Sequence, residues 1–311
     1  MTTKFEVDIW GHSTAGKTAL LLGLYDYLKQ KYEGHGTKIE DLKASDKLKK
    51  MRTEVINDGI LRRSENTETI SYQFDDFNFE ITAQTGEFFN SLDDKKVKEY
   101  TRNNKLLIIA INPFSLGVKN LSSNTAGNET IAWQGFNQFV SILKVKGKSE
   151  VDAATEGLNR LFSINLSEPV HKKFNNAILG AGGVDMGKLE ELTDQYFTNL
   201  DFSTPTKNLL DIFSRVKNNR YMIVITHGDV LDTFLKYNYQ QTMKMIGTLL
   251  SEKILRNIQV RQIYVSSTIH LSLKNGELKF EFDSGSAEIF HNQILSFLPR
   301  RRWSWLPQNR T

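Results

Sequence analysis

The chain of 311 residues contains no cysteine. This absence excludes disulfide frameworks, zinc sites built on thiolates, and cysteine nucleophiles. The 6 histidines are scattered and form no HExxH or comparable metal-binding pair. No apolar run approaches the roughly 18 residues that a membrane-spanning helix needs, and the opening residues, MTTKFEVD, lack the hydrophobic stretch of a secretory signal. A cytoplasmic protein is therefore expected.

An excess of charge of one sign is also missing. Lys and Arg number 40 against 36 for Asp and Glu, and four of the arginines lie in the acid-free tail 300–311, so the rest of the chain is formally neutral. Nucleic acid is therefore not expected as a partner of the main body. The tail also holds Trp303, Trp305 and Leu306. Its composition suits docking to a protein, a membrane surface or a phosphate backbone, although a terminus without a role fits as well.

Hydrophobic periodicity predicts strands that alternate with helices, and a doubly wound α/β sheet follows from that order. The predicted strands are Lys4–Trp10, Thr69–Phe74, Asn78–Ala83, Lys105–Ile111, Tyr221–Thr226 and Val260–Ser266, with a hairpin of Ile269–Leu273 and Leu278–Phe282 around Asn275-Gly276. Helices are predicted at Lys17–Tyr32, around Leu48–Val55, at Leu231–Arg256 and at Ser286–Leu298. Residues 113–220 show helical patterning without an obvious strand. We expect a sheet domain of residues 1–112 and 221–299, a helical insertion at 113–220, and the tail 300–311.

The residues Gly11-His12-Ser13-Thr14-Ala15-Gly16-Lys17-Thr18 match the phosphate-binding pattern GxxxxGK[ST]. They follow a predicted strand and open a predicted helix, which is the context that this motif requires. Glycines let the backbone wrap a phosphate chain with its N–H groups pointing inward, at the positive end of the helix dipole. Lys17 is expected to reach the β- and γ-phosphates and Thr18 to bind Mg²⁺. Gly11, Ser13, Thr14, Ala15 and Gly16 complete the predicted loop; the alternative is a plain glycine-bearing turn.

Three later segments follow predicted strands in a set order. Ala83-Gln84-Thr85-Gly86-Glu87 resembles the DxxG switch II segment of GTPases, Thr226-His227-Gly228-Asp229 resembles [NT]KxD, and Ser266-Ser267-Thr268 resembles the SAK-type loop. With the phosphate-binding loop, the chain resembles the translation-factor-related (TRAFAC) clade of P-loop GTPases over about 200 residues. It is most similar to the divergent bacterial, double-GTPase-like branch with a Gly-Glu pair in switch II. The resemblance implies a three-layer, G-domain-like P-loop fold with a mostly parallel sheet, a helical insertion and a late β-hairpin. It also implies GTP or GDP with Mg²⁺ as the bound cofactors.

The resemblance also assigns a role to each matching residue of the base site. Asp229 is expected to accept hydrogen bonds from the guanine N1–H and amine, which adenine cannot supply; a helix N-cap is the alternative reading. Thr226 would brace the phosphate-binding loop. A backbone N–H of the Ser266–Thr268 segment, with Ser266 and Ser267 as the candidates, would meet guanine O6. His227 replaces the usual lysine and could stack on the base.

Switch I has to supply a threonine that binds Mg²⁺ and senses the γ-phosphate. Thr67 is the first candidate because it lies just before a predicted strand, and Thr69 is the second. Arg62 and Arg63 lie where some GTPases carry an arginine finger, although a solvated pair is the simpler reading. Contacts of the γ-phosphate with Thr67 and Gly86 would order the two switches.

The sequence departs from the family pattern in switch II. Ala83 stands where an aspartate usually holds Mg²⁺ through water, and Asp75 and Asp76 lie too far away to replace it. Glu87 stands where related enzymes place a water-orienting glutamine, so it could orient water, act as a base, repel the γ-phosphate or form a salt bridge. The leading hypothesis is therefore a slow GTPase switch with a protein partner at its switches or helical insertion. A nucleotide-binding scaffold and a P-loop ATPase or kinase are the alternatives.

Overall fold

The structure is a computed structural model. It describes residues 2–11, 15–34, 38–61, 64, 66–86, 93, 95–96, 105–112, 117–118, 200–201, 221–229, 240, 244, 263–265, 267–274 and 277–298. Most of the expected insertion 113–220, nearly all of the expected helix Leu231–Arg256 and the whole tail 300–311 lie outside these ranges. No helix within the described ranges is long and apolar enough to cross a membrane.

Seven strands form one sheet in the order β2-β3-β4-β1-β5-β8-β9. Their bounds are β1 (Thr3–Trp10), β2 (Ile39–Ala44), β3 (Glu68–Phe74), β4 (Phe77–Ala83), β5 (Leu106–Ile111), β8 (Tyr221–Ile225) and β9 (Ile263–Val265). The pairs from β4 through β1, β5 and β8 to β9 are all parallel, while β2–β3 and β3–β4 are antiparallel. Every residue of β5 and β8 is buried, as expected of central parallel strands. The predicted α/β fold with a mostly parallel sheet is confirmed.

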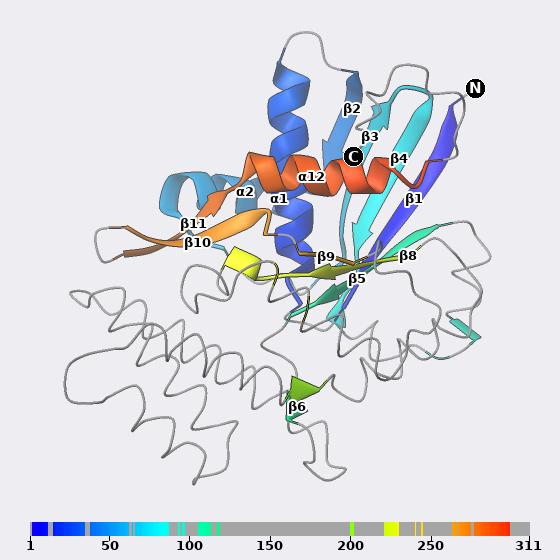
Figure 1. Cartoon of the computed structure of the whole chain (residues 1–311). Helices are drawn as coiled ribbons and strands as arrows, with labels where there is room; N and C mark the ends of the chain where they lie inside the picture. Colours follow the sequence, from blue (N-terminus) through cyan, green and yellow to red (C-terminus); the bar gives the residue numbers. More distant parts are fainter. Residues whose placement is uncertain are drawn as a thin grey trace, which may run out of the picture.

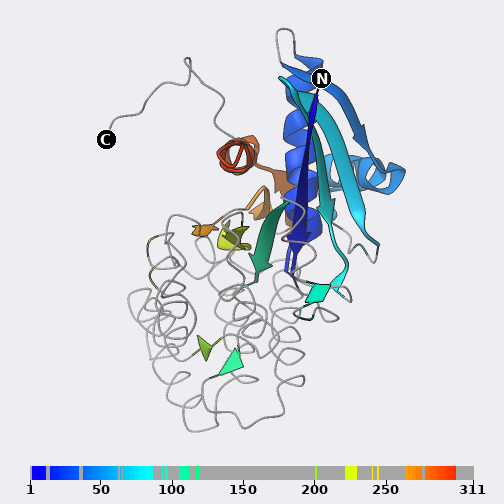
Figure 2. The same cartoon turned by 90° about the vertical axis from the view of Figure 1, so that its right-hand side faces the viewer.

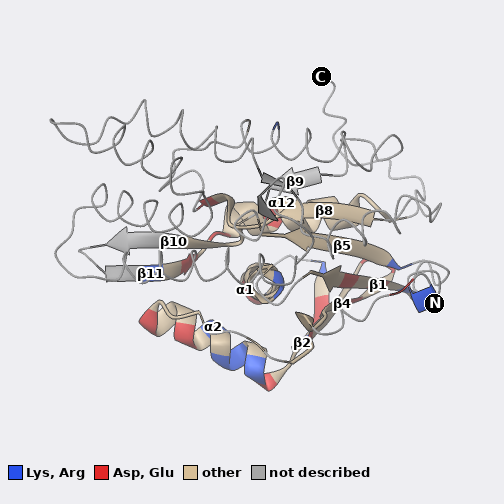
Figure 3. Ribbon diagram, turned by 90° about the horizontal axis from the view of Figure 1, so that it is seen from below, with Lys and Arg blue, Asp and Glu red and all other residues tan. Residues whose placement is uncertain are grey.

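Three helices are described, namely α1 (Lys17–Glu33), α2 (Asp46–Asp58) and α12 (Ser284–Leu295). Leucines of α1 pack into the same buried core as β1, β3 and β4, and α12 crosses α1 and appears end-on in Figure 2 (Figures 1 and 2). Charged residues recur along the helix α2, whereas β8 contains none (Figure 3). Its residue Arg52 donates to Asp26 of α1 at 2.7 Å. All three helices contribute to one hydrophobic core.

Two smaller sheets complete the described structure. The predicted late hairpin is present as β10 (Ile269–Lys274) and β11 (Glu277–Phe282), paired from Ile269–Phe282 to Lys274–Glu277. The second small sheet pairs β6 (Gly117–Val118) with β7 (Leu200–Asp201). This pair corrects the expectation that residues 113–220 contain no strand. Two residues per strand are too short to leave a readable alternation in the sequence.

The sequence also failed to predict β2, which lies in the stretch 33–66 that reads as polar apart from one helix. Only Ile39 of this strand is buried, so no alternation of apolar and polar residues marks it. Its pairing with β3 shifts register between Glu40 and Lys43, and Asp41 has a positive φ of 52°. Irregularity of this kind is common on edge strands, where it discourages pairing with another chain.

Candidate nucleotide-binding site

Strand register brings the predicted motifs to one edge of the sheet. Ala83 at the end of β4 is the Cα partner of Ile9 on β1 and of Glu68 at the start of β3. On the other side of β1, Ile225 at the end of β8 partners the ends of β5 and β9. In the sheet, β1 lies between β4 and β5. The segments that follow β1 in the sequence therefore add strands first on one side of β1, up to β4, and then on its other side, from β5 onward. Ligands bind outside the carboxyl ends of parallel strands at such a switch point.

The loop after β1 is shaped by two glycines that leave no room for side chains. A Cβ on Gly11 would lie 2.6 Å from the Ala110 carbonyl oxygen of β5. Gly16 has a φ of 76° and is the N-cap of α1, which has no side-chain cap. Ala15 is buried and Thr18 is half-buried, while His12, Ser13 and Thr14 lie outside the described residues. Amide groups at an uncapped helix start are oriented to bind an anion.

Lys17 places a cation at the same point. It is only 6% exposed, and its Nζ donates to the Gly11 carbonyl oxygen at 2.6 Å across the loop. A buried ammonium group is costly unless it has anionic or strongly polar partners. The glycine cradle, the uncapped helix and the buried lysine therefore fit a nucleotide phosphate chain. Mg²⁺ prefers oxygen ligands, and the hydroxyl oxygens of Thr18 and Thr67 fit that preference.

The candidate switch I residue Thr67 is exposed and directly precedes β3. Glu68, which is 2% exposed, holds the segment before Thr67 in place through hydrogen bonds. This carboxylate accepts hydrogen bonds from Ser64 and from Ser45, the N-cap of α2. The second candidate, Thr69, contacts Thr82 of β4 through its hydroxyl at 3.1 Å. Arg62 and Arg63 fall outside the described residues.

The predicted switch II segment begins at Ala83, the last residue of β4, without a carboxylate at that position. Ala83 is 2% exposed and belongs, with Ile9, to the hydrophobic core that also includes residues of α1. The next residue, Gln84, donates from its backbone to the Ile9 carbonyl at 3.0 Å. Gly86 is described, and Glu87 lies outside the described residues. Asp75 lies in the turn at the far end of the β3–β4 hairpin, where it pairs with Lys38 at 2.8 Å.

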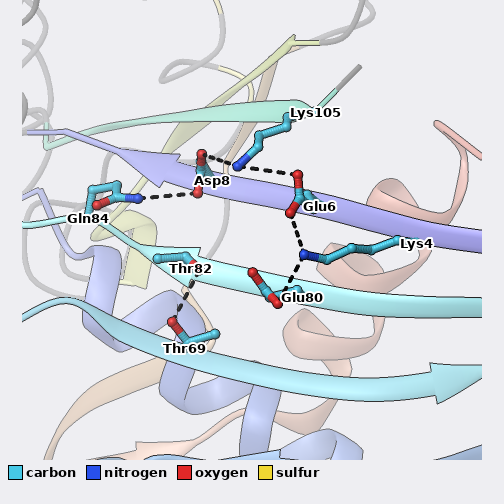
Figure 4. Close-up of polar contacts among 8 residues, drawn as sticks. All are labelled: Lys4, Glu6, Asp8, Thr69, Glu80, Thr82, Gln84 and Lys105. Carbon is cyan, nitrogen blue, oxygen red and sulfur yellow. Dashed lines mark hydrogen bonds and ion pairs between the residues drawn. The ribbon is translucent and has the colours of Figure 1, made fainter. Parts of the chain in front are cut away.

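Sequence reasoning missed a buried acid that contacts Gln84 of the predicted switch II segment. Asp8 of β1 is 4% exposed, and its Oδ1 accepts from Gln84 Nε2 at 3.3 Å. Figure 4 shows it on the strand face that also carries Glu6 and faces Lys105. Burial raises the pKa of the Asp8 carboxyl, although Lys105 and Gln84 lower it in part. Because side chains alternate along a strand, Asp8 points away from the face of Ala83 and does not replace its missing carboxylate.

On the other flank of the phosphate-binding loop, Thr226 and His227 pack against Gly16. A Cβ on Gly16 would lie 3.1 Å from the Thr226 Cβ and 3.3 Å from the His227 Cε1. The Thr226 hydroxyl donates to the Ile111 carbonyl at 3.2 Å and contacts His227 Nδ1 at 2.8 Å. Desolvation lowers the pKa of His227, and Asp229 raises it in part. The His227 ring therefore packs against Gly16 of the predicted phosphate-binding loop.

Asp229 and Ser267 join the two predicted base-reading segments. Ser267 Oγ donates to Asp229 Oδ1 at 2.7 Å and accepts from the Asp229 backbone N–H at 3.1 Å. Helical conformation already begins at Gly228, so Asp229 lies in the first turn rather than at the N-cap. Ser266 lies outside the described residues. Ser267 thus holds the carboxylate just beyond the carboxyl ends of β8 and β9.

The sheet order defines an α/β protein with a mostly parallel sheet, and the residues at its edge fit the predicted phosphate-binding loop. No protein-family model and no curated protein matches the chain. Two solved structures of the Ski7 GTPase-like domain from S. cerevisiae are similar to it. The structure bound to GTP is 10% identical with a TM-score of 0.39, and the match covers 97% of this chain and 52% of that one. The structure bound to GDP and inorganic phosphate is 12% identical with a TM-score of 0.35, covering 86% and 43%. The chain thus spans about half the length of these structures, and the likeness is too distant to transfer a function.

Proposed function

We propose that this chain binds guanine nucleotides and acts as a slow, Mg²⁺-dependent GTPase switch. The observation that carries the proposal is the juxtaposition at one sheet edge of a phosphate cradle and a base-reading pair. The cradle consists of Gly11, Gly16 and the buried Lys17, and the pair consists of Asp229 and Ser267. A carboxylate suits the adjacent N1–H and amine donors of guanine, and adenine leaves it unpaired.

The switch would work through segments that flank the γ-phosphate position. Thr67 and Gly86 lie beyond the paired ends of β3 and β4, so a γ-phosphate could order both at once. A protein partner would bind these switches or the insertion 113–220. We also propose a cytoplasmic location, a place in the divergent bacterial double-GTPase-like branch, and docking of the tail 300–311 to a protein or a membrane surface.

A second candidate function is a nucleotide-binding scaffold with almost no hydrolysis. Ala83 favours it, because the position next to Ile9 offers no carboxylate to hold Mg²⁺ through water. Both candidates require guanine nucleotide binding, and they differ in turnover. Glu87 is the residue proposed to orient the attacking water in the switch.

The test begins with the nucleotide that copurifies with the protein, identified by chromatography of an acid extract. We expect GDP or GTP in the wild type, none in Lys17→Ala, and wild-type occupancy in Lys31→Ala. Lys31 is an exposed lysine on the same helix and controls for the loss of charge. An adenine nucleotide would overturn the guanine assignment, and binding that survives Lys17→Ala would overturn the phosphate site.

Phosphate release from GTP with Mg²⁺ then separates the two candidates. The switch predicts single-turnover hydrolysis that is faster in the wild type than in Glu87→Ala. Equal rates in a protein that binds GTP tightly would favour the scaffold.

A further inference from the structure

Helix α1 contains a glycine in its middle, Gly23, at a position where glycine destabilises a helix by up to about 1 kcal/mol relative to alanine. The neighbouring segment explains its presence. A Cβ on Gly23 would lie 2.4 Å from both Cβ and Oγ1 of Thr268, and 2.7 Å from its carbonyl oxygen. Only a residue without a side chain lets the segment after β9 approach the helix this closely.

Thr268 is fixed from two sides. It is 1% exposed, and its hydroxyl donates to the Ala19 carbonyl of α1 at 2.9 Å. In an α-helix that carbonyl also accepts from the amide four residues later, which belongs to Gly23. The Thr268 carbonyl accepts from the backbone N–H of Asp283, the N-cap of α12, at 3.0 Å. The segment is therefore clamped between α1 and the start of α12.

This clamp lies one residue away from the base-reading pair. Ser267 directly precedes Thr268 and holds both the carboxylate and the backbone N–H of Asp229. On its other side, Thr268 contacts the helix α1, whose first residue is Lys17. The contact between Gly23 and Thr268 thus links the helix of the phosphate site to the carboxylate of the base site.

We propose that Gly23 and Thr268 are positioning residues for guanine specificity, because their contact sets where Asp229 lies relative to the phosphate chain. The proposal rests on the proposed function, since it assumes that Asp229 reads guanine. A methyl group at position 23 must move Thr268 by about 1 Å, from 2.4 Å to the ordinary contact distance that begins at 3.4 Å. Hydrogen bonds weaken steeply with such shifts, and misplacement by about 1 Å is costly at sites that need exact geometry.

The test measures dissociation constants of GDP, IDP and ADP by calorimetry on nucleotide-free full-length protein. IDP lacks the guanine amine, so the ratio of its dissociation constant to that of GDP reports on Asp229. In Gly23→Ala we expect this ratio to fall at least about tenfold, while ADP affinity changes less than about threefold. Gly34→Ala is the matched control, because Gly34 ends the same helix with a φ of −81° and its Cβ would meet nothing closer than 3.4 Å.

A second pair of variants covers the case in which Gly23→Ala does not fold. Thr268→Val keeps the shape and removes the hydrogen bond to Ala19, and Thr268→Ser restores the hydroxyl. The first should lose the GDP preference and the second should keep it. Faster hydrogen exchange at the Asp229 amide in Thr268→Val would show that the loss passes through Ser267.

The outcomes separate this proposal from the proposed function. A wild type that binds ADP as tightly as GDP, or binds neither, overturns the proposed function. If the wild type prefers GDP and the folded variants keep that preference, only the positioning role of Gly23 and Thr268 is overturned. The same holds if the variants lose affinity for GDP, IDP and ADP by one common factor.

Discussion

Asp8 of β1 carries a carboxylate that is buried in the sheet. It lies beside Gln84 of the predicted switch II segment. Its Oδ2 has no hydrogen-bond partner among the described residues and lies 3.7 Å from Lys105 Nζ. Lys105 also pairs with Glu6 at 3.3 Å, and Glu6 pairs with Lys4 at 2.6 Å (Figure 4). Among the described residues, Asp8 therefore shares the cation of Lys105 with a second acid. Desolvation outweighs this attraction and raises the pKa of the carboxyl.

Replacing Asp8 by asparagine should stabilise the protein at neutral pH. Because the folded-state pKa is raised, the ionised carboxylate costs stability, and that cost grows as pH rises from 3.8 through the folded pKa. Asparagine does not ionise and can still accept from Gln84. We expect Asp8→Asn to raise the free energy of unfolding by about 1 kcal/mol at pH 7 and to leave it unchanged near pH 3. Urea denaturation at both pH values measures this, with the exposed Asp58→Asn as control. A loss of stability at pH 7 would show that the pairing with Lys105 is the stronger effect.

At the scale of elements, α12 is joined to the sheet by a buried histidine. His291 is 3% exposed, and its Nε2 lies 2.9 Å from the Tyr72 hydroxyl of β3. Its ring also packs 5.8 Å from the ring of Tyr27 on α1. Burial lowers the pKa of His291 to about 4, and burial raises the pKa of Tyr27 to about 12. The cluster is therefore uncharged at neutral pH, and protonation would place a cation in the core.

Acid should loosen α12 through this residue. The unfolded chain binds a proton at His291 near pH 6.5 and the folded protein only near pH 4, so stability falls as pH drops between these values. The loss is roughly 3 kcal/mol by pH 4, because each unit of pKa shift is worth about 1.4 kcal/mol. His291→Gln keeps a polar partner for Tyr72 and cannot titrate. We expect it to be less stable than the wild type at pH 7 and to show a flatter dependence on pH between 6.5 and 4. Parallel slopes in urea denaturation would contradict the assignment.

For the whole molecule, the sequence was sufficient to predict most of the strands and the order of the motifs along the chain, but not the contacts between the motifs. The strands β1, β3, β4, β5 and β8 and the late hairpin were predicted because alternation or an unbroken apolar run marks each of them. The strand β2 was missed because one buried residue leaves no pattern. The contact of Thr268 with Ala19 joins residues that are 249 positions apart in the sequence, and no local signal encodes it. Gly23 alone could have indicated a close approach, since glycine is unfavourable within a helix.

Nucleotide binding should stabilise the molecule as a whole, because the site draws on segments after β1, β4, β8 and β9. These strands share one sheet, and a ligand that binds only the folded chain raises the free energy of unfolding. GDP at 100 times its dissociation constant contributes about 2.7 kcal/mol, which corresponds to a rise in Tm of roughly 5 °C for a chain of this length. Lys17→Ala should abolish the rise, as measured by scanning calorimetry.

Magnesium should add little to that stabilisation in the wild type. Ala83 supplies no carboxylate, so Tm with GDP or a non-hydrolysable GTP analogue should differ by less than about 1 °C between MgCl₂ and EDTA. Ala83→Asp reverses the expectation. The new carboxylate lies opposite the buried Glu68 on the same sheet face, because directly paired residues of antiparallel strands share a side. Two neighbouring carboxylates repel each other, so this variant should melt below the wild type in EDTA and recover with Mg²⁺ and nucleotide together. A wild type whose Tm depends strongly on Mg²⁺ would show that other groups hold the ion without a carboxylate at position 83. A variant that Mg²⁺ does not rescue would show that position 83 does not face the metal.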